Sequence, residues 1–171
     1  MNNKPIPYKA SFTFGRFNIP HNGHAQLVQQ MLAYSEVAYV CVSSGGTNND
    51  WDTRVLMFRT VCRHAGVDLR RVNFVKAREA KAALGEILPQ VPFGECVIVL
   101  GSDQEALARF LSEHHDCPFI LNRRTNSSTS MRSFIDYAEF EKVRELYDGN
   151  LFATNLSYIL RKEELLREKS A

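Results

Sequence analysis

Long apolar segments are missing from this sequence, and so is any strong excess of charge. No apolar run approaches the roughly 18 residues that a membrane-spanning helix needs, and the first residues, Met1 to Lys9, lack the apolar centre of a secretion signal. The formal net charge is only +2, whereas proteins that bind nucleic acids neutralise many phosphates with a basic surface. We therefore expect a cytoplasmic protein that binds neither membranes nor nucleic acids.

Closely spaced cysteines are missing too. The four cysteines, Cys41, Cys62, Cys96 and Cys117, include no Cys-x-x-Cys pair. The sequence therefore predicts neither a zinc site nor a disulfide framework. We expect buried, reduced thiols and no metal held by the protein itself.

What the sequence does contain is a regular alternation of short apolar runs and longer stretches with apolar residues at helical spacing. Such alternation is typical of an α/β fold with a parallel sheet and helices on both faces. We expect a single domain over residues 1–171, helical from about 133. The predicted strands are Ser11–Phe14, Val37–Val42, Val72–Val75, Cys96–Leu100 and Pro118–Leu121. The predicted helices cover about 22–34, 52–64, 80–88 and 103–114, with Asp52 capping the second.

The loop after the first predicted strand carries the strongest functional signal. It reads Gly15-Arg16-Phe17-Asn18-Ile19-Pro20-His21-Asn22-Gly23-His24. Its glycines allow a sharp turn or a close ligand, and a helix beginning here offers free backbone N–H groups to a phosphate. His21 and His24 add N–H donors, so the run predicts an anion site. The alternatives are that the histidines only cap the helix or bind zinc, although no third ligand stands at a suitable spacing.

A second polar run, from Asn126 to Arg132, follows the last predicted strand. The hydroxyls of Ser127, Ser128 and Thr129 are suited to cap a helix and to bond a phosphate. Arg132 adds a permanent cation. A plain helix cap is the alternative interpretation of this run.

The two runs together resemble the nucleotidylyltransferase superfamily, with its His-x-Gly-His motif and a later Ser-Ser-Thr-x-x-Arg motif. Gly15-Arg16-Phe17 before the histidines makes the resemblance greatest to the nicotinamide and nicotinate mononucleotide adenylyltransferases. The resemblance implies a Rossmann-like open parallel sheet of five strands with ATP above the first motif. His21 and His24 would hold the ATP phosphates, with His24 at the α-phosphate, and Arg132 would face the departing pyrophosphate. Asn126 departs from the family, which prefers an apolar residue there.

The resemblance also implies further ATP contacts. Gly101-Ser102-Asp103 follows the fourth predicted strand, where a carboxylate would accept from sugar hydroxyls; alternatively, Asp103 only caps the next helix. The implied ATP-binding residues are Gly15, Arg16, Phe17, Gly23, Gly101, Asp103, Ser127, Ser128 and Thr129.

The residues implied to bind the acceptor substrate form a weaker set. Trp51 would stack on a flat ring, or else it anchors a loop. Arg54 matches a family arginine, although it would serve equally to hold a structural carboxylate. Arg123 and Arg124 would bind the acceptor phosphate, or else they lie in a solvated loop.

The predicted reaction is transfer of AMP from ATP to the phosphate of nicotinamide or nicotinate mononucleotide, with release of pyrophosphate. The predicted partners are ATP and this phosphorylated small molecule, in a monomer or a homo-oligomer, with Mg²⁺ bound mainly through the ATP phosphates. Phosphopantetheine adenylyltransferase and cytidylyltransferase activities are the alternatives. A hypothesis of another class is a nucleotide-binding regulatory protein without activity. A class I aminoacyl-tRNA synthetase is disfavoured, because 171 residues leave no room for tRNA-binding domains.

Overall fold

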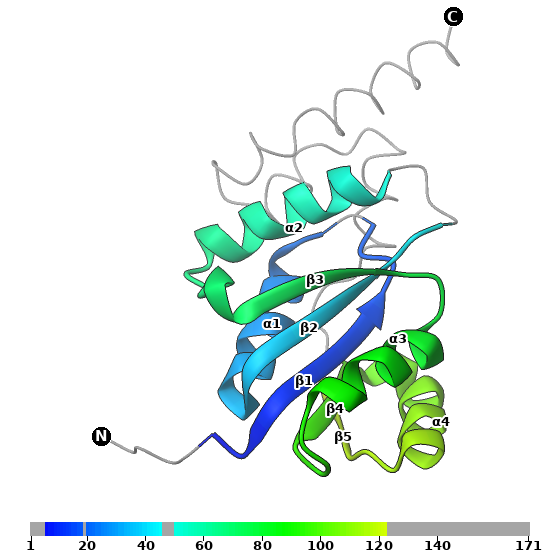
Figure 1. Ribbon diagram of the computed structural model, residues 1–171. Helices are drawn as coiled ribbons and strands as arrows, with labels where there is room; N and C mark the ends of the chain where they lie inside the picture. Colours follow the sequence, from blue (N-terminus) through cyan, green and yellow to red (C-terminus); the bar gives the residue numbers. More distant parts are fainter. Residues whose placement is uncertain (1–5, 19, 46–49, 123–171) are drawn as a thin grey trace, which may run out of the picture.

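The computed structural model describes residues 6–18, 20–45 and 50–122. Within them a parallel sheet of five strands has the order β3-β2-β1-β4-β5, as Figure 1 shows. This confirms the predicted open α/β fold. The strands are β1 (Tyr8–Gly15), β2 (Ser35–Ser43), β3 (Val72–Ala77), β4 (Cys96–Gly101) and β5 (Phe119–Asn122).

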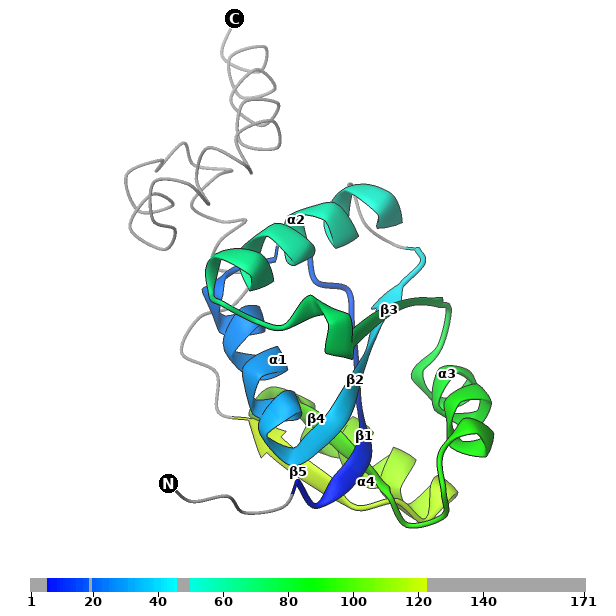
Figure 2. The ribbon, with the colours of Figure 1, turned by 60° about the vertical axis from the view of Figure 1, so that its left-hand side comes forward.

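Four α-helices among the described residues cover the two faces of the sheet (Figures 1 and 2). Helices α1 and α2 pack on one face with the apolar residues of one core cluster, and α3 and α4 pack on the other with a second cluster. Every residue of β4 is buried, as expected for a strand covered on both faces. The helices are α1 (Asn22–Tyr34), α2 (Trp51–His64), α3 (Ala80–Ile87) and α4 (Glu105–His115).

The strand order places the connection between β1 and α1 at the point where the winding of the sheet reverses. β1 pairs with both β2 and β4, so the chain reverses its direction of winding beside β1. In open parallel sheets such a switch point leaves a crevice at the carboxyl ends of the strands, where ligands bind. Gly15, at the end of β1, and His21 and His24, at the start of α1, therefore lie at this crevice.

Two local predictions need correction. Helix α2 begins at Trp51 and is capped by Asp50, whose side chain accepts from the Thr53 N–H at 2.7 Å; the predicted cap, Asp52, is already inside the first turn. Helix α4 begins at Glu105, because residues Ser102–Gln104 form a 3₁₀ turn first. The predicted buried, reduced thiols are confirmed for all four cysteines.

No helix in the described part of the chain has the length and apolar character needed to cross a membrane. The predicted helical segment from about 133 lies outside the described residues.

Candidate functional site

The first turn of α1 is built around the two histidines of the first motif. His21 is the N-cap, and its Nδ1 accepts the Gly23 N–H at 3.0 Å. His24, three residues on, accepts the His21 N–H on its own Nδ1 at 3.3 Å. This reciprocal pair is a capping box in which imidazoles replace the usual hydroxyl and carboxylate. The alternative that the histidines cap the helix is therefore confirmed as one of their roles.

The capping box decides which backbone groups of α1 are occupied. The Gly23 N–H bonds to His21 Nδ1, and the His24 N–H bonds to the His21 carbonyl at 2.9 Å. The expectation of free N–H groups is wrong for these two residues. A neutral imidazole whose Nδ1 accepts a hydrogen bond carries its proton on Nε2. Each ring therefore has its N–H donor at Nε2.

The two imidazole rings are held rigidly. They stack with centroids 4.0 Å apart and an interplanar angle of 21°. The His24 ring contacts the Phe17 ring edge-to-face, with ring centroids 4.9 Å apart, and lies 5.7 Å from the centroid of the Phe58 ring. These contacts hold the pair from the core side. Both imidazoles are almost fully buried, with His21 1% and His24 3% exposed. The result is two adjacent donors in surroundings that exclude most water.

Gly15 and Phe17 position this pair through an unusual backbone. Phe17 adopts a left-handed conformation with φ +49°, which is costly for an aromatic residue, and its ring is buried in the core. A Cβ at Gly15 would lie 3.2 Å from that ring. The glycine is therefore needed for close approach of the Phe17 ring. The predicted ATP contact of Phe17 stays a prediction, whereas its contact with His24 is observed.

Arg54 joins three segments at the carboxyl edge of the sheet. Its Nη1 donates to the Arg16 carbonyl at 2.6 Å, its Nη2 to the Ser43 carbonyl at 2.7 Å, and its Nε to the Asp50 carbonyl at 3.2 Å. The side chain is 1% exposed, and this burial lowers the pKa of the guanidinium. These three partners are backbone carbonyls, and the alternative that Arg54 holds a structural carboxylate stays open. The acceptor contact predicted for Arg54 stays a prediction, beside this observed structural role.

Trp51 lies at the first position of α2 and is half-buried. Its indole Nε1 donates to the Val42 carbonyl at 3.2 Å. Val42 pairs with Lys76 in the sheet, and Lys76 Nζ lies 5.8 Å from the centre of the indole ring system, within the range of a cation–π contact. Trp51 therefore ties α2 to the end of β2 and has a cation beside its ring.

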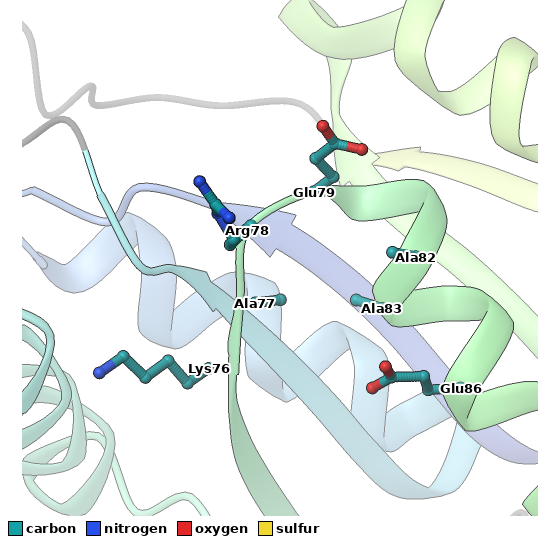
Figure 3. Close-up of a pocket in the computed structure, with 7 residues that line it drawn as sticks. All are labelled: Lys76, Ala77, Arg78, Glu79, Ala82, Ala83 and Glu86. Atoms are coloured by element: carbon teal, nitrogen blue, oxygen red, sulfur yellow. The ribbon is translucent and has the colours of Figure 1, made fainter.

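A cavity of about 710 Å³ opens at the carboxyl end of β3. Lys76, Ala77, Arg78 and Glu79 line it from the strand end and the turn that follows (Figure 3). The remaining lining residues, Ala82, Ala83 and Glu86, come from α3, whereas Lys76 extends toward α2. Two cations and two carboxylates thus surround a space at the same edge of the sheet as the histidines. None of these four charged residues is among the site residues predicted from the sequence.

The other side of the crevice is formed by β4 and β5. Gly101, at the end of β4, is buried and pairs with Asn122 at the end of β5. Asp103 is exposed and lies in the 3₁₀ turn, one residue before the Gln104 cap of α4. The alternative that Asp103 caps α4 is therefore wrong. The described chain ends at Asn122, so the predicted site residues Arg123, Arg124, Ser127, Ser128, Thr129 and Arg132 lie outside the described residues.

Phe58 is a site residue that sequence reasoning missed. It is fully buried, and the centroid of its ring lies 4.9 Å from that of Phe17 and 5.7 Å from that of His24. An apolar residue in the predicted helix 52–64 favours a core position, but nothing in the sequence indicates that Phe58 contacts His24. In the part of the chain that the structure describes, no three His, Cys, Asp or Glu side chains gather as a metal site.

Comparisons with known proteins agree with this architecture. A family model described as cytidylyltransferase-like matches residues 12–134. No curated protein sequence matches the chain. The fold is similar to that of a bifunctional NMN adenylyltransferase/ADP ribose pyrophosphatase from Francisella tularensis, with a TM-score of 0.73 and 18% identity. That alignment covers 95% of this chain and 54% of the Francisella chain, so this chain spans about half the length of that protein. Another structure of the Francisella protein is complexed with AMP and a manganese ion.

Two further structures share the fold. Nicotinic acid mononucleotide adenylyltransferase from Plasmodium falciparum, complexed with NaAD, has a TM-score of 0.68 and 12% identity, covering 88% of this chain and 96% of that one. TmcAL from Thermotoga maritima, bound with alpha-thio ATP, has a TM-score of 0.59 and 14% identity, covering 90% of this chain and 56% of that one. At these identities the likeness establishes the fold.

Proposed function

The chain belongs to the cytidylyltransferase-like family, and from this membership we propose that it transfers AMP from ATP to the phosphate of nicotinate or nicotinamide mononucleotide. The nucleotidyltransferase predicted from the sequence is thereby confirmed at the level of the family. One observation carries the finer proposal. The capping box holds two stacked imidazoles at the switch point of the sheet, each with its N–H on Nε2.

The Nε2 donors suit a triphosphate for an electrostatic reason. A donor in surroundings of low dielectric interacts with an anion more strongly than one in water, and fixed donors cost no reorganisation during the reaction. Because His21 and His24 are almost fully buried, ATP binding must move neighbouring side chains apart. In the proposed site His24 donates to the α-phosphate and His21 to a neighbouring phosphate.

The proposed chemistry is one in-line displacement. An oxygen of the acceptor phosphate attacks the α-phosphorus of ATP, a new P–O bond forms, and the bond to the β-phosphate bridging oxygen breaks to release pyrophosphate. The attacking oxygen is already anionic, so no general base is required. Catalysis then rests on position and on charge stabilisation. We assign charge stabilisation at the leaving group to Arg132, with Ser127, Ser128 and Thr129 bonding phosphate oxygens.

The nucleoside part of ATP is assigned to the β4 side of the crevice. Gly101 has no side chain and ends β4 at the carboxyl edge of the sheet, and the exposed Asp103 carboxylate follows in the next turn. A carboxylate at this position suits the sugar hydroxyls of a nucleotide. Gly15, Arg16 and Gly23 complete the proposed ATP contacts on the β1 side.

A divalent cation, Mg²⁺ in this proposal, would neutralise phosphate charge. Since the described residues offer no cluster of three protein ligands, ATP phosphates and water would hold the ion, as is usual for Mg²⁺. The Francisella structure with AMP and a manganese ion is consistent with a divalent metal in proteins of this fold.

The acceptor is assigned to the β2–β3 side of the crevice. There Trp51 offers an aromatic face, and the cavity after β3 supplies space with the cations of Lys76 and Arg78. Arg123 and Arg124 are proposed to bind the acceptor phosphate. We assign Arg54 an indirect role, because its guanidinium holds the Arg16 and Ser43 carbonyls that border this side.

A substrate panel tests the proposal. The full chain with Mg²⁺ and either ATP or CTP is offered nicotinate mononucleotide, nicotinamide mononucleotide, phosphopantetheine or choline phosphate, and pyrophosphate release is measured. We expect release with ATP and a pyridine mononucleotide, together with the corresponding dinucleotide by mass spectrometry. Release only with phosphopantetheine would replace the proposed acceptor, and release only with CTP would replace ATP as the nucleotide donor. Binding of ATP without release in any arm would favour the regulatory protein instead.

Trp51 provides a separate prediction about the acceptor. Trp51→Phe keeps an aromatic face and loses the N–H bonded to Val42, whereas Trp51→Ala loses both. If the ring stacks on the acceptor, Trp51→Ala raises the acceptor KM by about 5- to 150-fold, the equivalent of about 1–3 kcal/mol of base stacking, and Trp51→Phe stays near wild type. Steady-state kinetics with each substrate varied gives both values. An equal rise in both variants, with a lower melting temperature, would mean that Trp51 acts only as an anchor.

A further inference from the structure

Two of the four cysteines lie side by side, away from the proposed active site. In the β4–β5 pairing Ile98 stands opposite Phe119. Cys96 lies two residues before Ile98, and Cys117 lies two residues before Phe119, just ahead of β5. Continuing the register therefore brings the two cysteines opposite each other. Alternate residues of a strand share a face, and both cysteines belong to the core cluster on the α3 and α4 side. The bond from the Ile98 N–H to the Pro118 carbonyl, 2.8 Å, continues the pairing toward them.

The Cys117 thiol also contacts the backbone of Cys96. Cys117 Sγ donates to the Cys96 carbonyl at 3.1 Å. A hydrogen bond between the two thiols is the main cause that raises the pKa of Cys96, and burial raises it further. The same hydrogen bond lowers the pKa of Cys117. Burial instead raises the pKa of Cys41 and of Cys62 to about 12 each. Of the four thiols, that of Cys117 is therefore the one that ionises most readily.

The distance between the strands suits a covalent bond. Directly opposed residues of neighbouring strands lie about 4.7–4.9 Å apart along the hydrogen-bonding direction, which falls within the range of about 4.4–6.8 Å between the Cα atoms of a disulfide. Cys96 is the first residue of β4, and Cys117 precedes β5. Both positions lie at the end of the paired region, where backbone adjusts more easily than in the middle of a strand.

A cavity gives small molecules a route to this pair. Buried cysteines are ordinarily inert, because reagents do not reach them. Here a cavity of about 160 Å³ is lined by Cys96, Cys117 and His115, together with residues of the 88–94 segment. That volume exceeds the share of about 30 Å³ that one water molecule occupies in the liquid, so hydrogen peroxide fits.

His115 adds a proton acceptor to the cavity. Burial is the main cause that lowers its pKa, so the ring is neutral at pH 7. Its Nε2 is buried and has no hydrogen-bond partner among the described residues.

We propose that Cys96 and Cys117 form a redox-active dithiol that hydrogen peroxide oxidises to a disulfide between the starts of β4 and β5. The Cys117 thiolate attacks a peroxide oxygen, the O–O bond breaks, and an S–O bond forms; the hydroxide released takes a proton and leaves as water. The Cys96 sulfur then attacks the Cys117 sulfenic acid, the S–O bond breaks, and the second hydroxide leaves as water with the Cys96 proton. Two thiols lose two electrons, and one peroxide becomes two waters. This inference does not rest on the proposed transfer reaction.

Peptide mapping of the native full chain tests the proposal. The reduced protein is treated with hydrogen peroxide, the remaining thiols are alkylated after unfolding, and trypsin is added. Because trypsin cuts after Lys81, Arg109 and Arg123, the cysteines fall on separate peptides, 82–109 and 110–123. We expect a disulfide-linked pair of these peptides, reversed by dithiothreitol, while Cys41 and Cys62 are lost at least about tenfold more slowly because they lack thiolate character.

Two matched variants sharpen the result. Cys117→Ser should leave Cys96 unoxidised, since the attacking thiolate is gone, and Cys62→Ser should leave the linked pair unchanged. Three outcomes would overturn the proposal: linkage only after unfolding, equal oxidation rates at all four cysteines, or sulfinic acid at Cys117 without the linked peptides. The wild-type map decides among them even if a variant does not fold.

Discussion

His24→Ala should lower turnover by about 10²–10³-fold, the effect of removing one donor from a developing phosphate charge. In the proposed mechanism His24 Nε2–H donates where charge builds on the α-phosphate, so the loss should fall mainly on kcat. The substitution also removes half of the capping box and the packing on Phe17. Some loss of stability is therefore expected beside the loss of rate.

A second variant separates the two effects. Glutamine at the third helical position is a usual member of a capping box, so His24→Gln should keep the His21 N–H satisfied and most of the stability. It should still turn over at least about 100-fold more slowly, since the amide does not reproduce the imidazole donor. His114→Ala, at an exposed histidine of α4, is the matched control and should behave as wild type. Near-normal turnover in both His24 variants, measured by pyrophosphate release, would remove His24 from the mechanism.

The second large effect concerns stability. Arg54→Met should lower the free energy of unfolding by about 3 kcal/mol or more, because the buried guanidinium donates to the carbonyls of Arg16, Ser43 and Asp50, and a hydrogen bond from a charged group contributes about 1.5–3 kcal/mol. Arg54→Lys should recover only part of this, since one ammonium does not span the places of three guanidinium nitrogens. Denaturant unfolding followed by circular dichroism gives the values.

Arg63→Met is the matched control for Arg54, because Arg63 lies on the same helix and is exposed. We expect a change below about 0.5 kcal/mol there, as for most surface substitutions. If Arg54→Met leaves stability within the range of the control and instead raises the acceptor KM, the acceptor contact predicted from the sequence is correct and the structural assignment is wrong.

The position of the histidine motif at a strand-to-helix junction could be predicted because its signals are local. The run from Gly15 to His24 contains the end of a strand, a turn and the start of a helix, all within a few residues. The predicted bounds of α1, 22–34, agree with the structure because the spacing of Leu27, Val28 and Met31 depends only on helix geometry. Tertiary contacts are not encoded so locally. The Arg54 bond to the Arg16 carbonyl joins residues 38 positions apart.

The sequence by itself determined the α/β alternation, the position of the histidine motif after the first strand, and the absence of close cysteine spacings. Only the tertiary structure decided that β1 lies between β2 and β4, that His21 and His24 stack on each other while His24 contacts Phe17 and Phe58, and that the Cys117 thiol reaches the Cys96 carbonyl. The physical reason is that helix and strand periodicity depends on neighbours along the chain. Strand order and side-chain contacts depend instead on which distant segments bury apolar surface against one another.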